Sequence, residues 1–332
     1  MRHGNPALFV PHLGCPHRCS FCDQRAITGV QRLPAPEDVR TLCKEAGQER
    51  GRSLELAFFG GSFTCIDRKY LLSLLEAAQP FLGTGISGIR ISTRPDAVGG
   101  EMLSLLKTRG VTAIELGAQS MSDAVLQKNG RGHSARDVEE AAERVRGFGF
   151  ELGLQMMLGL DGAEESDDLA TARALIACRP DTVRLYPALV LRGTGLAERM
   201  QRGEYRPLTL EEGVRRTARV MELFGEAPDI RIIRVGLHPS RSLEEKLLAG
   251  PYHPAFRELC EGELMLFRLL RQIGNSDLSG RTVTAAIAPG ELSRMLGQKR
   301  CNAAEIERRG ARLRVVEQAG RPPLSPLLLS IK

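Results

Sequence analysis

Residues 8–22 read Leu8-Phe9-Val10-Pro11-His12-Leu13-Gly14-Cys15-Pro16-His17-Arg18-Cys19-Ser20-Phe21-Cys22. The apolar run at the start predicts a β-strand, and three cysteines with the spacing Cys-x3-Cys-x2-Cys follow it on one loop. In folds that alternate strands with helices around a barrel, functional groups collect at the carboxyl ends of the strands. This stretch therefore predicts an α/β fold whose functional site begins directly after the first strand.

Short apolar runs and longer amphipathic stretches alternate over most of the chain. Further strands are expected at 54–59, 89–91, 113–116, 150–158 and 183–186, and helices at 36–50, 67–80, 99–109, 134–147 and 165–178. Runs that are apolar on both faces favour a parallel sheet covered by helices. Six such units predict a partial (β/α)6 barrel of the TIM type. Ser134 and Asp137 predict a capping box at the start of the helix at 134–147.

The pattern changes after about residue 235. A long helix is expected at 254–273, a strand at 281–286, a helix at 291–309 and a strand at 311–317, followed by a proline-rich tail at 322–326 that cannot continue regular structure. We therefore expect a barrel domain at residues 1–236 and a small α+β appendage at residues 237–332.

The cysteine triplet predicts a metal centre. Thiolates are the usual ligands of iron–sulfur clusters, and three of them leave one iron of a four-iron cluster without a protein ligand. An open position of this kind distinguishes a catalytic metal site from a closed structural one. The same residues also allow a zinc site in which His12 or His17 completes the coordination. Each of the other five cysteines is predicted to be a small buried hydrophobic residue: Cys43, Cys65, Cys178, Cys260 and Cys301.

Glycine and polar motifs follow the other predicted strands. Gly60-Gly61-Ser62-Phe63 would let the backbone approach a ligand closely, although a plain tight turn fits equally well. Ser92 lies at the end of the third strand, and Gln119 ends the fourth, where its amide could reach a ribose or a carboxylate. Four arginines near these ends could bind phosphate or form salt bridges with neighbouring carboxylates: Arg94, Arg131, Arg184 and Arg192.

The composition is that of an ordinary globular enzyme with a small positive excess. The 332 residues include 46 basic and 40 acidic side chains, giving a formal net charge of +6, which allows an anionic partner such as RNA without requiring one. The first residues lack the apolar core of a signal peptide, and no apolar run is long enough to span a bilayer. We therefore expect a cytoplasmic protein with no membrane partner, in which clustered cysteines serve metal binding or catalysis.

Several motifs in a fixed order resemble the radical S-adenosylmethionine (SAM) domain of the elongator protein 3 family. They are Cys-Pro-His-Arg-Cys-Ser-Phe-Cys at 15–22, Gly-Gly-Ser-Phe at 60–63, Ser-Thr-Arg-Pro-Asp at 92–96, Leu-Gly-Ala-Gln-Ser at 116–120 and Arg-Gly-His-Ser at 131–134. The similarity continues through residues 185–196, Gly203-Glu204-Tyr205 and Ile232-Ile233-Arg234-Val235. It covers roughly residues 8–236.

This resemblance implies a partial barrel that binds a 4Fe-4S cluster and SAM. The cluster ligands would be Cys15, Cys19 and Cys22. Phe21 would lie beside the adenine, and the methionine amino group would be held by the stretch of Gly60, Gly61, Ser62 and Phe63. Polar contacts to SAM would come from Ser92, Gln119 and Arg131, and substrate contacts from Arg94, Tyr186 and Arg192.

The sequence also departs from that family. The first two cysteines lie closer together than in elongator proteins, and Ser92 stands where the family more often has glutamate. Residues 237–332 do not resemble its acetyl-CoA-binding fold, so acetyl-CoA-dependent carboxymethylation of wobble uridine is not implied. The stretch from Leu292 to Arg300 resembles the tail of a shorter bacterial branch.

The expected activity is reductive cleavage of SAM to a 5′-deoxyadenosyl radical, with tRNA or another RNA as the substrate. A small metabolite or a peptide is the alternative substrate, and a non-catalytic iron–sulfur or zinc module is the alternative class. A basic surface that reaches Arg281, Arg294, Lys299 and Arg300 would favour RNA, whereas a closed apolar cavity would favour a metabolite. An electron donor of the flavodoxin or ferredoxin type is the other expected partner.

Overall fold

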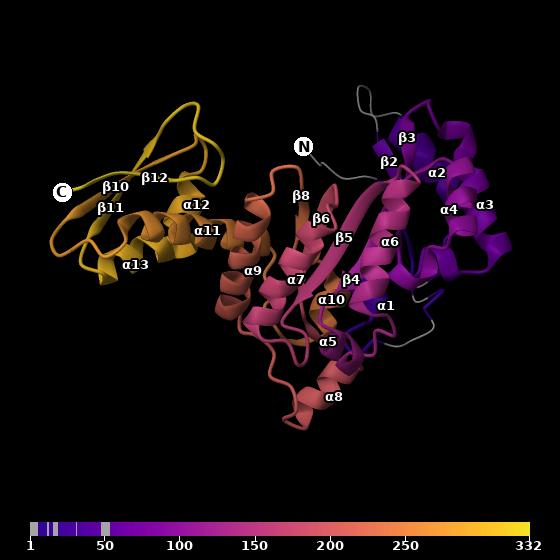
Figure 1. Ribbon diagram of the computed structural model, residues 1–332, viewed down its shortest axis with the longest axis horizontal. Coiled ribbons are helices and arrows are strands. Elements are labelled where there is room, and N and C mark those ends of the chain that lie inside the picture. Colours follow the sequence, from indigo (N-terminus) through magenta and orange to yellow (C-terminus); the bar gives the residue numbers. More distant parts are fainter. Residues whose placement is uncertain (1–5, 12, 16–18, 31, 48–53) are drawn as a thin grey trace.

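A curled sheet of seven parallel strands forms the larger part of the molecule (Figure 1). The computed structural model describes residues 6–11, 13–15, 19–30, 32–47 and 54–332. The strands follow one another in chain order: β1 Ala7–Val10, β2 Leu54–Gly60, β3 Ile86–Thr93, β4 Val111–Gln119, β5 Glu151–Leu158, β6 Thr182–Pro187 and β8 Arg231–Val235. The partial barrel is confirmed, with β8 as a seventh strand. Forty-three residues separate β8 from β6, which breaks the strand–helix period that the sequence pattern follows.

Helices cover the outer face of this sheet. They are α2 Pro36–Gly47, α3 Arg68–Ala78, α4 Gly100–Thr108, α6 Ala135–Gly147, α7 Glu165–Ala177 and α9 Leu210–Gly225. Shorter helices lie in the connecting loops: α1 Gln24–Thr28, α5 Asp123–Lys128, α8 Gly195–Gln201 and α10 Arg241–Lys246. The predicted capping box of Ser134 and Asp137 begins α6. None of the helices in the described ranges is long and apolar enough to cross a membrane.

The two faces of the sheet differ in polarity. Side chains on the outer face, such as Ile114, Leu154 and Leu185, join one large hydrophobic core with the helices. The positions that alternate with these along the strands face inward, and several of them carry charged side chains, among them Arg90 and Glu115. The prediction that the strands are apolar on both faces is therefore wrong for the inner face, because a barrel that does not close leaves room for polar groups there.

The charged groups of the inner face compensate one another. Glu115 is 1% exposed and binds both ends of the Arg184 guanidinium, at 2.6 and 2.8 Å. Arg90, next to it, binds Glu55 at 2.7 Å and Glu151 at 2.9 Å. A buried charge that lacks a partner is far more costly than a paired one, so these five side chains depend on one another.

The C-terminal part has its own sheet and core. It consists of α11 Phe256–Ile273, β10 Thr282–Ile287, α12 Leu292–Leu296, α13 Cys301–Arg308, β11 Arg312–Glu317 and β12 Leu327–Ile331. The strand order is β11-β10-β12, with β11 parallel and β12 antiparallel to β10. A small antiparallel pair, β7 Val190–Leu191 and β9 Leu247–Ala249, lies elsewhere in the chain.

Two features of this part differ from the sequence prediction. The helix expected at 291–309 is two helices, because residues 297–300 form a tight loop that includes the short 3-10 turn η4 Gln298–Arg300 and in which Gly297, Lys299 and Arg300 have positive φ. The strand β12 after the proline-rich tail was not predicted. Helix α11 joins the two cores, since Cys260 and Leu264 belong to the barrel core and later residues of the helix to the C-terminal core.

Replacing Glu115 by alanine is expected to destabilise the fold by about 3–5 kcal/mol, because Arg184 and Arg90 would then share an uncompensated buried charge. Chemical denaturation of the metal-free protein measures this change. Glu101→Ala is the matched control: its pair with Arg68 is exposed, and the expected loss is below about 1 kcal/mol. Equal losses in the two variants would contradict this account of the inner face.

Candidate functional site

The cysteine loop lies directly against the glycine pair that ends β2. The amide of Gly61 donates to the Val10 carbonyl at 2.8 Å, and the amide of Ser62 donates to the Leu13 carbonyl at 3.1 Å. A Cβ atom on Gly61 would overlap the Leu13 carbonyl oxygen, and one on Gly14 would overlap the Ser62 carbonyl oxygen. These glycines are needed first of all for the contact between the two backbones.

The second half of the loop is held by a buried asparagine. Ser20 donates its amide to the Asn129 carbonyl at 3.0 Å and its hydroxyl to the Asn129 side chain at 2.8 Å. Asn129 is fully buried, and its amide donates to the carbonyls of Val125 and Asp161. Sequence reasoning missed this residue, since Asn129-Gly130 reads only as a turn.

The three predicted ligand thiols are close enough to affect one another. Burial, together with the neighbouring Cys19 and Cys15 thiols, raises the pKa of Cys22 to about 12. Burial also raises the pKa of Cys15. A guanidinium lies against them: the Arg131 guanidinium is 3.3 Å from the Cys19 Sγ and donates to the Gly117 carbonyl at 2.6 Å, and the positive charge of Arg94 also acts on Cys15. Its Nε is buried and has no partner among the described residues.

This donor set fits an iron–sulfur cluster. Three thiols on one loop, with a buried guanidinium beside them, suit a negatively charged thiolate-bound group. Among the residues that the structure describes, no three His, Cys, Asp or Glu side chains surround a single metal ion. A cluster spreads its thiolates over different irons and does not need such a group. His12 and His17, the candidates for zinc coordination, lie outside the described residues.

Two predicted polar SAM contacts come together over Gly117. A Cβ atom at that position would lie 2.9 Å from the Gln119 amide nitrogen and 3.4 Å from an Arg131 guanidinium nitrogen. Gln119 has φ +68°, a conformation that L-residues seldom adopt, at the point where β4 ends. Ser92 lies on the inner face of β3, where its hydroxyl accepts a bond from Gln155 at 3.4 Å.

The side chains of Ser62 and Phe63 face the protein. The Ser62 hydroxyl bonds Thr93 at 2.8 Å, and Phe63 stacks on Phe58 with the ring centroids 4.8 Å apart. Both side chains are almost completely buried. Only the backbone of this stretch is therefore left to contact a cofactor.

Phe21 lies between two small apolar clusters at the carboxyl ends of the strands. It packs against a cluster that contains Leu196 and Tyr205, and also against a cluster that contains Val125 and Leu160. The ring is partly buried. Its position is therefore fixed by packing on both sides, and in the sequence it lies between the predicted ligands Cys19 and Cys22.

The predicted substrate residues occupy three different settings. Arg94 is buried, binds Asp96 through two nitrogens and donates to the Arg131 carbonyl at 2.9 Å, which favours the salt-bridge interpretation. Tyr186 lies on the inner face beside Arg184. Arg192 is exposed in the loop before α8. The structure therefore does not bring these residues together.

An inner-face cation that the sequence did not single out is Arg234 on β8. It lies opposite Arg184 in the sheet register and donates from Nε to the Gly236 carbonyl at 2.8 Å. Within the described chain it has no carboxylate partner, unlike Arg184. Burial lowers the pKa of Arg234, and Arg184 acts in the same direction. Arg234 is thus positioned to receive an anionic group.

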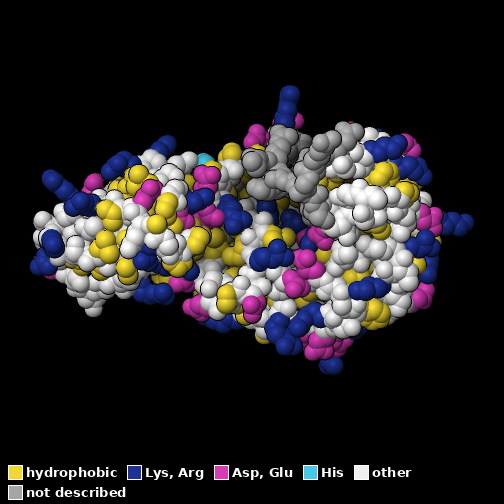
Figure 2. Space-filling model, turned by 90° about the horizontal axis from the view of Figure 1, so that it is seen from above, with side chains coloured by type: hydrophobic (Ala, Val, Ile, Leu, Met, Phe, Trp, Pro, Cys, Tyr) yellow, Lys and Arg dark blue, Asp and Glu magenta, His cyan; other side chains and the backbone are white. Residues whose placement is uncertain are grey.

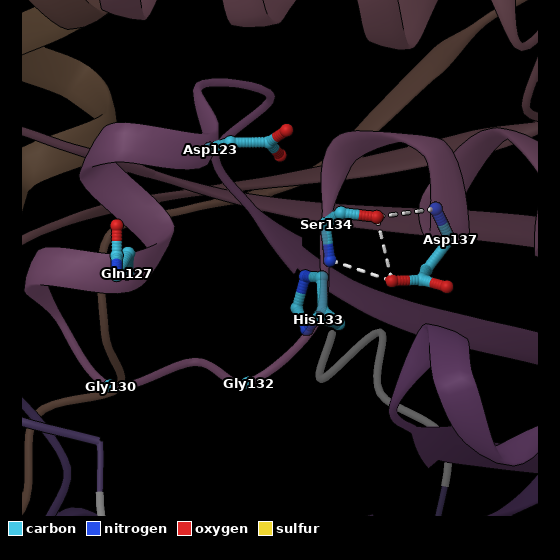
Figure 3. A pocket seen from close by; sticks show the side chains of 7 residues that line it. All are labelled: Asp123, Gln127, Gly130, Gly132, His133, Ser134 and Asp137. Carbon is cyan, nitrogen blue, oxygen red and sulfur yellow. Dashed lines mark hydrogen bonds between the residues drawn. The ribbon is translucent and has the colours of Figure 1, made fainter.

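A pocket of about 530 Å³ adjoins the segment that carries Arg131 (Figure 3). Ser134 and Asp137 bond each other there in the capping box. The His133 Nε2 donates to the Ala118 carbonyl at 3.1 Å, and burial, aided by Arg131, lowers the pKa of His133 to about 4. His133 is therefore neutral at pH 7. The remaining lining residues are Asp123, Gln127, Gly130 and Gly132.

The cysteines outside the loop differ in exposure. Cys43 and Cys260 are buried, as predicted, and Cys178 is partly buried. Cys65 and Cys301 are exposed, so the prediction of buried thiols is wrong for these two. Cys65 lies in the short turn after Phe63, and Cys301 begins α13, where the helix presents it to solvent.

Comparison with sequence models of protein families shows which family the chain belongs to. The model of the Radical SAM superfamily matches residues 9–175. The chain belongs to the radical SAM superfamily. The Radical_SAM C-terminal domain matches residues 180–265. The protein is thus a radical SAM enzyme, and members of this superfamily typically bind a 4Fe-4S cluster and SAM.

Curated relatives agree with the predicted elongator-like resemblance. A tRNA uridine(34) acetyltransferase of Dehalococcoides mccartyi is 28% identical over 239 residues, covering 60% of this chain and 52% of its own length. The human Elongator complex protein 3 is 34% identical over 176 residues, covering 52% of this chain and 31% of its own. The chain thus spans about a third to a half of these relatives.

Solved structures support the fold. The archaeal elongator protein 3 of Methanocaldococcus infernus, lacking its N-terminus, superposes with a TM-score of 0.53 at 21% identity. That match covers 73% of this chain and 62% of that chain. SuiB of Streptococcus suis, in a structure bound to SAM, gives a TM-score of 0.50 at 12% identity and covers 72% of this chain and 48% of its own.

Replacing Gly61 by alanine is expected to displace the cysteine loop, because the added methyl group overlaps the Leu13 carbonyl. The variant should lose most of the visible absorbance and the iron content that the parent protein gains on anaerobic reconstitution. Gly147→Ala is the control, since a Cβ atom there meets open space at the end of α6. A Gly61→Ala variant that reconstitutes as fully as the control would show that the backbone contact is dispensable.

Proposed function

We propose that the protein cleaves SAM reductively at a 4Fe-4S cluster held by Cys15, Cys19 and Cys22. The bound cluster would supply the electron that breaks the bond between the SAM sulfur and C5′, giving methionine and a 5′-deoxyadenosyl radical. The observation that carries this proposal is the contact of Arg131 with Cys19, on a loop whose three thiols interact and whose two halves are both anchored.

The chain's own residues would hold these partners and exclude water. Arg131 offsets the negative charge of the thiolates, and its bond to the Gly117 carbonyl fixes its direction. The amide of Gln119 and the backbone at 60–63 lie around the same loop and would contact the SAM ribose and methionine ends. Phe21, packed on two sides, would present its ring to the adenine. Ser92 offers a further hydroxyl on the inner face.

RNA, in particular tRNA, is the substrate that we propose. Curated relatives carry the name tRNA uridine(34) acetyltransferase, and the inner face of this barrel is charged where a metabolite enzyme with a closed apolar cavity would be hydrophobic. Arg234, which lacks an acidic partner among the described residues, could receive a phosphate at the inner face. Tyr186 lies beside Arg184 on the adjacent strand, β6.

Alanine replacement of Cys15, Cys19 or Cys22 is expected to abolish cluster absorbance and 5′-deoxyadenosine formation together, because each thiol is a ligand. Anaerobic incubation with SAM and dithionite, followed by chromatography, measures the product. Cys178→Ala removes a thiol of similar exposure outside the loop and should retain both signals. Cluster loss in Cys178→Ala, or its full retention in a loop variant, would show that the wrong ligands were chosen.

Deleting the gene is expected to remove one modified nucleoside from cellular tRNA. Mass spectrometry of digested tRNA from cells with and without the gene measures this loss. Restoring the gene should return the nucleoside, whereas restoring the Cys19→Ala variant should not. Identical nucleoside profiles in all four strains would reject RNA as the substrate and leave the cleavage of SAM as a separate question.

A further inference from the structure

The positive charge of the protein is concentrated at its C-terminal end. Residues 274–332 contain ten basic and five acidic side chains, a formal net charge of +5, while the 273 residues before them sum to +1. Figure 2 shows Lys and Arg side chains projecting from the outline of this part, at the left of the view. A concentration of this kind is the electrostatic footprint expected of a nucleic-acid-binding unit.

The order of elements in this part is strand, helix, loop, helix, strand. β10 leads into α12, residues 297–300 turn the chain into α13, and β11 returns parallel to β10 at the edge of the sheet. Both helices lie on the face of the sheet that carries the C-terminal core. In one class of RNA-binding module, a tight glycine-containing loop of four residues clamps the phosphate backbone of a single strand.

The loop has the tight geometry that such a clamp requires. Gly297 has φ +74°, and a Cβ atom there would overlap the side chains of Cys301 and Asn302. Lys299 and Arg300 also have positive φ, of +51° and +61°. Arg300 stands at the fourth position, where the RNA-binding class has glycine, yet it adopts the left-handed conformation that glycine favours.

A buried asparagine in the first turn of α13 fixes the position of this loop. Asn302 is 2% exposed, and its amide donates to the carbonyls of Gly262 on α11 and Met295 on α12, at 2.9 and 3.2 Å. The loop is thus tied to both preceding helices. Its exposed side chains, Gln298, Lys299 and Arg300, are presented to solvent from a rigid base.

The charges of the loop are unpaired, in contrast to those at the other end of α13. In the described part of the chain, no carboxylate lies within ion-pair distance of Lys299 or Arg300. Arg308 and Arg309 are different, because Glu305 binds both of them, at 2.5 and 2.8 Å. The loop therefore offers two positive charges whose natural counterpart is an external anion.

We infer that the loop Gly297-Gln298-Lys299-Arg300 clamps the phosphate backbone of single-stranded RNA. The inference rests on the proposed RNA function and names the part of the chain that captures the strand. Lys299 and Arg300 contact phosphates, the loop backbone sets their spacing, and the barrel carries out the chemistry on the captured strand. The partner is recognised by its chain of phosphates, whereas an acidic protein surface would need no such fixed loop.

The test measures the binding of a fluorescent single-stranded RNA to the full-length protein by anisotropy, at several salt concentrations. The double variant K299A/R300A should lose about 10- to 30-fold in affinity near 0.1 M salt, and its log–log salt slope should fall by about 1.4, as expected for two lost phosphate contacts. The double variant R308A/R309A removes the same charge from paired positions and should keep the parent affinity within about twofold.

A second variant distinguishes RNA binding that depends on the shape of the loop from general electrostatic attraction. G297A keeps every charge but forces the loop to move, so it should also lose RNA affinity while its circular dichroism stays that of the parent. Equal losses in R308A/R309A and K299A/R300A, or competition by poly-glutamate as strong as by RNA, would overturn the inference.

Parallel measurement of SAM cleavage by the parent protein distinguishes the two proposals. Cleavage without loop-dependent RNA binding rejects the clamp alone. Loop-dependent RNA binding without cleavage upholds the clamp and rejects the proposed chemistry.

Discussion

The close contact between two backbone segments, at the ends of β1 and β2, is the constraint on which the site depends. Gly14 and Gly61 have no room for a side chain, so the start of the cysteine loop at Leu13 and Gly14 packs directly against the segment that follows β2. Hydrogen bonds that the Gly61 and Ser62 amides donate to the carbonyls of Val10 and Leu13 hold the two segments together. Cys15 owes its position to this contact, while Asn129 holds the half of the loop that carries Cys19 and Cys22. A loop that was held only by a metal would have to pay its ordering entropy when the metal binds.

The polar interior of the barrel follows from its incomplete closure. A closed barrel fills its centre with apolar side chains, whereas the open sheet here carries buried, paired charged groups on its inner face. Glu115 binds Arg184 through both of its carboxylate oxygens, and Arg234 on the neighbouring strand has no acidic partner among the described residues. The paired Arg184 therefore contributes to stability, while the neighbouring Arg234 offers a positive charge to an anion on the same face of the sheet.

Local patterns predicted the parts of the structure that local forces decide. The positions of the first six strands, the capping box at Ser134 and the cysteine spacing can all be read within a few residues. Asn129 could not be found in this way, because its importance lies in bonds to Ser20, more than a hundred residues away in the chain. Glu115 was hidden for the same reason, since its partners lie on other strands. The polar inner face likewise depends on barrel closure, which no short pattern encodes.

Helix α11 links the chemistry of the barrel to the recognition that we assign to the C-terminal loop. Its first half packs in the barrel core through Cys260 and Leu264, and its second half builds the C-terminal core. The Gly262 carbonyl, which lies between Cys260 and Leu264, accepts the hydrogen bond from Asn302 that fixes the loop. One continuous helix thus connects the loop to the barrel with no flexible linker between them. A strand held at the loop would therefore meet the barrel at a set distance and orientation, which a reaction at one chosen nucleotide requires.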